Sequence, residues 1–271
     1  MPRAAASVPS GGSKYSNWTM TPSDAMSKYF TGLVLDEVPQ LLEESYRLRY
    51  DVYCRDRHFL PADDYPDHSE RDTFDGHSVH VGVVNSQGGV VATARLVEMS
   101  DAGLPLFSHC TLFPDQTPLD DPARRVVEVS RLCVSRVYNR RAGDEFYSLG
   151  SHPPRTDGPE RRGGGEIVLA LYKALYQASK RRGFTHWLAA TEKSLQRLFV
   201  KYGFPFRTIG PESDYYGLVA PYLMDLGEFD SVITSHRIPL LSEFLDDLEP
   251  EFRPPADHDV SARDAAAHDP A

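Results

Sequence analysis

The segment Val126-Val-Glu-Val-Ser-Arg-Leu-Cys-Val-Ser135 has the dense β-branched content of a buried strand, yet it carries Glu128 and Arg131 in its middle. An unpaired buried charge costs several kcal/mol, so these two side chains need a partner or a polar cleft. Two interpretations stay open at this point. One is a structural ion pair between the two strand charges, and the other is a strand that lines a reaction cleft.

The spacing of the two charges separates these interpretations. Side chains alternate between the faces of a strand, so Glu128 and Arg131, three residues apart, would point to opposite faces of a regular strand. A β-bulge near Ser130 would reset the alternation, bring both side chains to one face and splay the strand from a neighbour. We therefore predict a bulge there, and a regular strand over Val127–Val134 would contradict the cleft.

Composition narrows the class of protein. The chain has 271 residues, with 41% hydrophobic and 25% charged, as is ordinary for a soluble globular protein. Its net charge of −10 argues against a nucleic-acid binder. Three cysteines without Cys-x-x-Cys spacing indicate a reducing compartment. We find no apolar run long enough to span a bilayer and no signal-peptide pattern, so we expect a cytoplasmic protein.

The Pro, Gly and Ser content divides the chain. We expect a flexible tail over residues 1–25, a single domain over 26–249 and a disordered tail over 250–271. Within the domain, residues 137–165 form a long insert rich in charges, Gly and Pro that we expect to be mobile. We find no internal repeats.

Periodicity gives the order of elements. We expect strands over 29–35, 79–84, 90–98, 185–190, 204–209 and 218–226, and helices over 36–54, 165–182, 191–201 and 239–248. Asp36 is the expected cap of the first helix. Arg49 and Tyr53 are neighbours on that helix, where an exposed arginine on an ordinary amphipathic helix is the plainer interpretation. Arg95 lies inside an apolar strand and must have a partner.

The loop over residues 58–75 is loaded with acids, including Asp72 and Asp75. It lacks the spacing and the tight-turn Gly of a calcium loop, so a solvated loop or a binder of a cationic group is favoured. His77 and His80 start a strand three residues apart and should face opposite sides, which argues against a zinc pair. We predict no metal site.

The segment Arg161-Arg-Gly-Gly-Gly165 precedes a helix. Glycines there present bare backbone N–H groups and the positive end of the helix dipole, and two arginines stand beside them. We therefore predict that Arg161, Arg162, Gly163, Gly164 and Gly165 bind a phosphate or pyrophosphate. The spacing matches neither the phosphate loop of nucleotide-binding proteins nor the dinucleotide fingerprint.

The order of elements resembles the Gcn5-related N-acyltransferase (GNAT) fold. The segments Leu48–Tyr53, Asp72–Asp75, Ala94–Leu96 and Glu128–Arg131 are similar, in order and spacing, to motifs of acyl-homoserine-lactone synthases and N-acyl amino acid synthases. They most resemble the acyltransferases associated with the bacterial PEP-CTERM/exosortase system. The resemblance covers about residues 30–230. It implies an α/β (α+β) fold with a central mixed, mostly antiparallel twisted sheet, helices on both faces and a splay at the Val126–Ser135 strand.

The resemblance also implies an activity. A fatty acyl group would pass from an acyl-carrier-protein or coenzyme A thioester to an amine, with no tightly bound cofactor. Glu128 and Arg131 would lie at the reaction centre. The amine-side site would comprise Arg49, Tyr53, Phe59, Asp72, Asp75 and Arg95. Homoserine-lactone synthases usually have Trp near the position of Phe59 and lack the long insert, so an amino acid is favoured as acceptor over S-adenosylmethionine.

The chemistry fits these residue types. A general base such as Glu128 would neutralise the attacking amine, and backbone N–H groups of Leu132, Cys133 and Val134, freed by the bulge, would stabilise the oxyanion. Cys133 as an acyl-accepting nucleophile is a minor alternative, because no partner histidine is evident. Other open alternatives are a coenzyme A-dependent acetyltransferase, a homoserine-lactone synthase and a non-catalytic acyl-thioester or amino acid binding module. A lipid product would allow peripheral membrane contact.

Overall fold

The computed structural model describes residues 29–114, 121, 123–138, 163–235, 244, 245 and 248–254. Its elements are β1 (Phe30–Val34), α1 (Pro39–Tyr50), a π-helical turn (Asp51–Asp56), short 3-10 helices (Ala62–Asp64, Thr73–His77, Pro105–Ser108, Pro250–Phe252), β2 (Ser78–Asn85), β3 (Val90–Glu98), β4 (Val126–Val134), α2 (Gly163–Arg182), β5 (His186–Thr191), α3 (Lys193–Lys201), β6 (Arg207–Thr208), β7 (Ser213–Asp214), β8 (Leu218–Asp225) and α4 (Leu226–Thr234).

Some predicted segments fall outside this range. The tail over 1–25, residues 139–162 of the insert, residues 255–271 and most of the helix expected at 239–248 lie outside the described residues. The chain that is described continues past the boundary expected at residue 249. There Pro250–Phe252 forms a short 3-10 helix, and the Arg181 guanidinium of α2 lies 5.2 Å from the ring centroid of Phe252.

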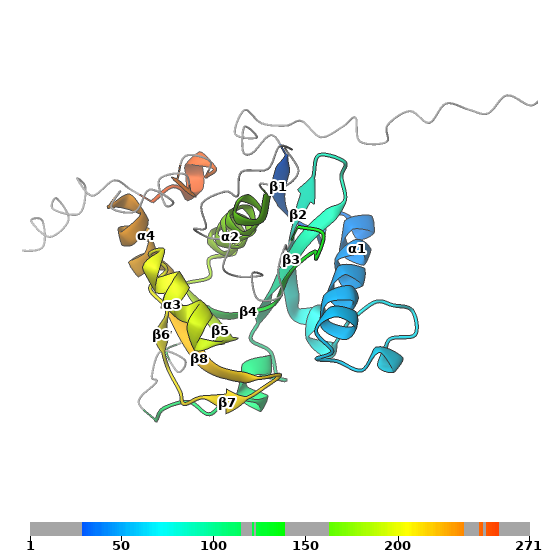
Figure 1. Cartoon of the computed structure of the whole chain (residues 1–271). Helices are drawn as coiled ribbons and strands as arrows, with labels where there is room; N and C mark the ends of the chain where they lie inside the picture. Colours follow the sequence, from blue (N-terminus) through cyan, green and yellow to red (C-terminus); the bar gives the residue numbers. More distant parts are fainter. Residues whose placement is uncertain are drawn as a thin grey trace, which may run out of the picture.

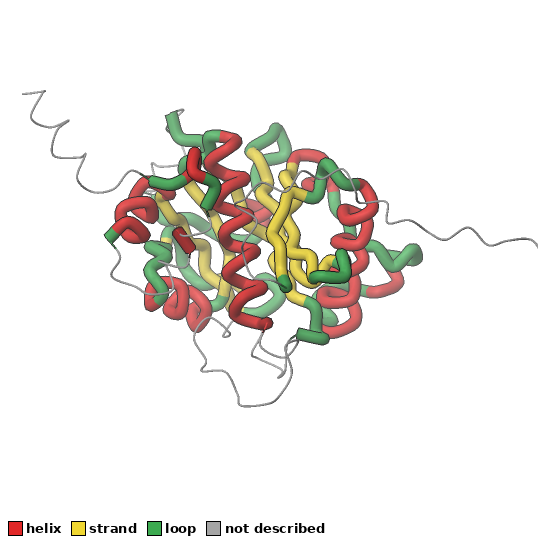
Figure 2. The backbone as a smooth tube through the Cα atoms, turned by 90° about the horizontal axis from the view of Figure 1, so that it is seen from above, coloured by secondary structure: helices red, strands yellow, loops and turns green. Residues whose placement is uncertain are grey.

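One mixed sheet forms the centre of the molecule, with strand order β1-β2-β3-β4-β5-β8-β6 and β7 paired with β8. Among the described strands, only the β4–β5 pair is parallel. Helices α1 and α2 lie on opposite sides of the β1–β3 part of the sheet (Figure 1), and helices flank the strands on both sides in the view from above (Figure 2). The predicted layering is therefore present.

The register between β2 and β3 places apolar side chains on one face of the sheet and polar or charged side chains on the other. Val81 lies opposite Ala94 and belongs to the main core with helix α2. His80 lies opposite Arg95 on the other face, toward α1, where its ring meets the Tyr46 ring edge-on at 5.5 Å. The sheet therefore presents an apolar face to α2 and a polar face to α1.

Helix α2 packs closely on the sheet because β1 carries a glycine at the contact. A Cβ atom on Gly32 would lie 2.6 Å from the Ala170 carbonyl oxygen. The helix ends as predicted at Gly183, whose φ of 70° suits a glycine after a helix terminus. It begins at Gly163, two residues earlier than predicted, so Gly163–Gly165 form its first turn instead of a preceding loop.

Two expectations about α1 are wrong. Asp36 does not cap the helix; its carboxylate accepts hydrogen bonds from the His80 backbone N–H at 2.8 Å and contacts the His80 Nδ1 at 2.7 Å. Val38 is the N-cap, without a side-chain hydrogen bond, and Pro39 begins the helix where its missing N–H costs nothing. The second wrong expectation concerns Arg49: an exposed side chain was the plainer interpretation, but the structure buries it, with 1% exposed.

The bulge in β4 is present. Arg95 of β3 pairs with Ser130 and Thr93 pairs with Cys133, so a step of two residues on β3 matches three on β4. Arg131 has a φ of 51°, a left-handed conformation uncommon for a residue with a Cβ atom. β4 pairs with β5 only as far as Glu128 opposite Leu188. Beyond that point the two strands diverge, which confirms the predicted splay.

Candidate active site

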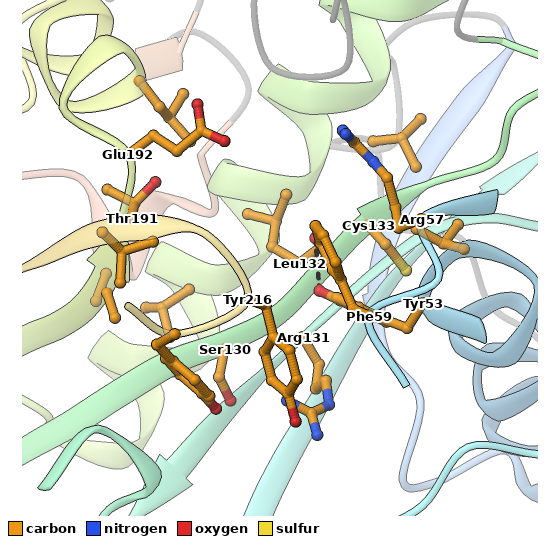
Figure 3. Close-up of a pocket in the computed structure, with 18 of the residues that line it drawn as sticks. Tyr53, Arg57, Phe59, Ser130, Arg131, Leu132, Cys133, Thr191, Glu192 and Tyr216 are labelled. Carbon is orange, nitrogen blue, oxygen red and sulfur yellow. Dashed lines mark hydrogen bonds between the residues drawn. The ribbon is translucent and has the colours of Figure 1, made fainter. Parts of the chain in front are cut away.

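A cavity of about 360 Å³ lies in the splay between β4 and β5 (Figure 3). One wall is β4 from Glu128 to Val134, and the other is Ala189–Glu192 at the end of β5. Because the strands separate there, the cavity reaches side chains from both faces of the sheet.

The lining is accordingly of two kinds. Val129 and Leu132 of β4 point toward the main core, where Leu195, Phe199, Phe206 and Tyr172 complete an apolar side. Tyr53, Phe59, Arg131, Tyr215 and Tyr216 form a polar and aromatic side. A molecule that bridges the two sides needs one apolar end and one polar end.

Glu128 lines the cavity on the same face of the sheet as Arg95 and Arg131, and it is 3% exposed. Burial raises the pKa of this carboxyl to about 7, against the opposing effect of a hydrogen bond from the Leu106 backbone N–H to Oε2 at 2.7 Å. A carboxyl group with a pKa near neutrality can take up and release a proton at physiological pH, as a general base requires.

The bulge in β4 brings the side chains of Glu128 and Arg131 into the same cavity, as their spacing in the sequence predicts. Ser130 contacts Arg95 on the α1 face, where its Oγ accepts a hydrogen bond from Arg95 Nε at 3.0 Å. Arg131 also turns to this face: its Nε donates to Glu70 at 3.1 Å and its Nη2 to Asp72 at 3.1 Å. Glu128 and Arg131 therefore line one cavity, and within the described residues they form no ion pair with each other.

Behind Arg131, a closed network joins α1, the acidic loop and β3. Arg49 holds Glu70 through Nε at 2.5 Å and both oxygens of Asp75 at 2.6 and 3.1 Å. Arg95 holds both oxygens of Asp72, at 2.6 and 2.7 Å, and reaches Asp75 at 2.7 Å. Such forked pairs are the strongest form of ionic hydrogen bond.

The capping of one short helix shapes this network. The Asp72 side chain accepts from the Phe74 N–H, and the Asp75 side chain accepts from the Asp72 N–H, a reciprocal capping box that begins the helix Thr73–His77. His80 joins the network through Nε2, 3.0 Å from Asp75. The two arginines and His80 hold the pKa of Asp75 far below its usual range despite partial burial.

The structure thus divides the predicted amine-side residues. Tyr53 and Phe59 line the cavity, whereas Arg49, Asp72, Asp75 and Arg95 lie behind it and pair with one another. Asp72 is the more open of these carboxylates, with 24% of its side chain exposed. Asp72 holds Arg131 and Arg95 holds Ser130 at the bulge, and Arg49 and Asp75 support them through the network, while contact with an acceptor stays a prediction.

Several site residues had no place in the sequence-based prediction. Glu70, which is fully buried, links Arg49 to Arg131, and its only signal was its membership of the acidic loop. His80 is considered in the sequence only as part of a zinc pair with His77, which its position argues against, and it is given no other role there. Tyr215 and Tyr216 form the tip of the β7–β8 hairpin, and the Tyr216 ring stacks on Phe59 at 5.8 Å.

The predicted donor-binding residues lie at two places. Leu132, Cys133 and Val134 line the cavity, and the Tyr53 hydroxyl donates to the Leu132 carbonyl at 3.1 Å (Figure 3). Burial raises the pKa of the Cys133 thiol to about 12, which keeps it protonated at neutral pH and argues against a nucleophilic role. Gly163–Gly165 open α2, and Arg161 and Arg162 lie outside the described residues.

Among the described residues, no group of three or more His, Cys, Asp or Glu side chains is placed to hold a metal ion. None of the helices described is both long and apolar enough to cross a membrane.

Comparison with known proteins supports the fold. Residues 48–148 match the family model described as "Acetyltransferase (GNAT) domain". No curated protein matches the chain. A solved structure of BjaI, a CoA-dependent acyl-homoserine lactone synthase with SAM and isopentyl-CoA, is similar with a TM-score of 0.50 and 19% identity, over 78% of this chain and 90% of that one.

Two other solved structures are similar at a lower score. FeeM, an N-acyl amino acid synthase from uncultured soil microbes, has a TM-score of 0.49 and 12% identity, over 75% of this chain and 93% of that one. TofI, in a ternary complex with an inhibitor and MTA, has a TM-score of 0.49 and 20% identity, over 82% of this chain and 99% of that one. The family match and the splayed, mostly antiparallel sheet with helices on both faces show that the chain has a GNAT-like fold.

Proposed function

We propose that the protein is an N-acyltransferase that moves a fatty acyl group from a phosphopantetheine thioester to the amine of an amino acid or similar small molecule. The observation that carries the proposal is Glu128, a buried carboxyl with a pKa of about 7 that lines a cavity with an apolar and a polar side. The apolar side suits an acyl chain, and the polar side suits an amine with a carboxylate.

The reaction proceeds by direct attack. The amine nitrogen bonds to the thioester carbonyl carbon while Glu128 takes the amine proton, directly or through water. Backbone N–H groups along the edge of β4 that no longer pairs with β5 stabilise the oxyanion. The C–S bond then breaks, and the departing thiolate takes up a proton. The high pKa of Cys133 favours this route over an acyl-enzyme on that thiol.

The donor is acyl carrier protein or coenzyme A, because both present the acyl group on the same arm. Among related systems, the sequence motifs favour the acyltransferases of the PEP-CTERM/exosortase system in a bacterial cytoplasm. The main alternative is homoserine-lactone synthesis from S-adenosylmethionine. The resemblance of the sequence motifs to those of acyl-homoserine-lactone synthases supports it. A non-catalytic acyl-thioester binding module is the alternative from another class.

The test uses the purified full-length chain with palmitoyl-CoA or palmitoyl-acyl-carrier protein and a mixture of amino acids, or S-adenosylmethionine alone. Mass spectrometry of the products should show N-palmitoyl amino acids. Formation of acyl-homoserine lactone would replace the proposal with the alternative acceptor. Donor binding with no product from either acceptor set would favour a binding module.

A further inference from the structure

Two arginines line the cavity close to the C-terminal end of β4, which is the end remote from Glu128. Arg136 lies two residues after β4, and Arg57 directly follows the π-helical turn. Asp56 ties the two segments together, since Arg136 Nη1 donates to Asp56 Oδ1 at 3.2 Å. In Figure 3 Arg57 lies beside Cys133 and extends away from Arg131.

The β4 wall of the cavity extends from Glu128 toward these arginines. It runs without interruption from Glu128 to Val134, six steps or at most roughly 20 Å of strand at about 3.3 Å per residue, and Arg136 lines the cavity two residues further on. Along this wall the β5 edge of β4 is unpaired among the described strands, because pairing with β5 stops at Glu128. An extended chain with amide groups can lie on such an edge as an added strand does.

We infer that Arg57 and Arg136 bind the phosphate of the donor's phosphopantetheine arm. The inference rests on the proposed function: with the thioester beside Glu128 and the arm along the open edge of β4, the phosphate end points to these two guanidinium groups. Arginine suits this role because its planar fork pairs with two oxygens of one phosphate.

The other charges at the cavity are consistent with this role. Arg131 is engaged by Glu70 and Asp72, so its guanidinium is committed near the reaction end. The Asp56–Arg136 pair is weak, because 81% of the Arg136 side chain is exposed to water, and a phosphate can exchange for Asp56. Glu192 belongs to the opposite wall, at the start of α3.

A matched pair of ligands isolates the phosphate. We would measure binding of S-octyl-phosphopantetheine and S-octyl-pantetheine, non-reactive thioethers that differ only in the phosphate, to the full chain by calorimetry. Arg57→Ala and Arg136→Ala should each raise the Kd of the phosphorylated ligand about tenfold and leave that of the other unchanged. Arg55→Ala is the control, since 68% of its side chain is exposed and it pairs with Asp51 outside the cavity lining.

The outcomes separate this inference from the proposed function. S-octyl-CoA and the S-octyl carrier protein, which carry the same phosphate, should respond to the two substitutions as the phosphorylated ligand does, and their wild-type affinities identify the donor. Unchanged binding, or equal weakening of both small ligands, would overturn the phosphate role while donor binding stands. Binding of no ligand by the wild-type protein would overturn both proposals.

Discussion

At the scale of single residues, Glu128 is set apart by its surroundings. Burial raises the pKa of the carboxyl, one backbone N–H offsets part of that effect, and the result is a pKa of about 7. Only the ionised form accepts a proton from an amine. The rate of acyl transfer should therefore rise with pH through about 7 and level off above it.

The substitution Glu128→Gln keeps the shape of the side chain and removes the base. We expect kcat to fall on the order of a hundredfold, the usual scale for a general base, with donor affinity retained. Steady-state kinetics at several pH values would measure both effects. A variant with the wild-type rate would remove Glu128 from the mechanism.

The same substitution has a predicted effect on stability. The pKa of Glu128 is raised above its ordinary value, so the folded protein holds this proton more tightly than the unfolded chain. The stabilisation is complete below the ordinary carboxyl pKa and is lost as pH rises through about 7. Above that pH the buried charge is a cost, so Glu128→Gln should raise Tm by about 2 °C or more at about pH 8. A lower Tm at that pH would show that the charge is well stabilised.

For Cys133 we predict that substitution leaves turnover largely intact, in contrast to Glu128. Its thiol is buried and its pKa is raised to about 12, so almost no thiolate exists at neutral pH. Cys133→Ala should retain kcat within roughly threefold, since the direct mechanism needs no thiol. Loss of turnover together with trapping of an acyl-thioester on the wild-type protein would restore the nucleophilic alternative.

At the scale of elements, the ionic network fixes helix α1 and the acidic loop against the bulge of β4. Arg49 is 1% exposed and pairs with Glu70 and Asp75. Its removal would take one ionic partner from each of two buried carboxylates, Glu70 and Asp75. Arg49→Ala should therefore lower the free energy of unfolding by about 3–5 kcal/mol in urea denaturation. Arg55→Ala, which breaks an exposed pair with Asp51, should change it by less than about 1 kcal/mol; equal losses would contradict the role of the network.

The sequence allowed the bulge to be predicted but not this network. Glu128 and Arg131 have a spacing that only a bulge can reconcile with one face, so local periodicity was sufficient. Arg49 was expected to be exposed because its partners come from a loop more than twenty residues away, whose path no local pattern specifies. Asp36 likewise has the residue type of a helix cap, yet its better partner, His80, is on another strand.

At the scale of the whole molecule, the fold and the presence of a cleft along β4 could be predicted from the order of elements, the family motifs and the charges of that strand, but most of the other residues that line the cleft could not. Its lining comes from the π-helical turn, β4, β5, α2, α3 and the β7–β8 hairpin. Tyr216 of the hairpin tip stacks on Phe59, and the hairpin is placed there because β8 lies beside β5 across the splay. Which residues meet there depends on tertiary packing, which a one-dimensional pattern does not contain.

The apolar side of the cavity gives a prediction about the donor. Each buried methylene group contributes about 0.8 kcal/mol, so a longer acyl chain gains binding energy from Leu195, Phe199 and Phe206. We expect kcat/KM for octanoyl thioester to exceed that for acetyl thioester by at least about a hundredfold. Competition between the two donors in one reaction would measure the ratio. A preference for acetyl would support the acetyltransferase alternative.

Acyl transfer to a small amine with Glu128 as base can be tested in cells by mass spectrometry of lipids after expression of the wild-type chain or Glu128→Gln. We expect new N-acyl amino acids with the wild-type chain and at most about one hundredth of that amount with the variant. The masses of the products would identify acyl chain and acceptor together. Equal amounts of the same new lipid from both proteins would exclude Glu128 as the base.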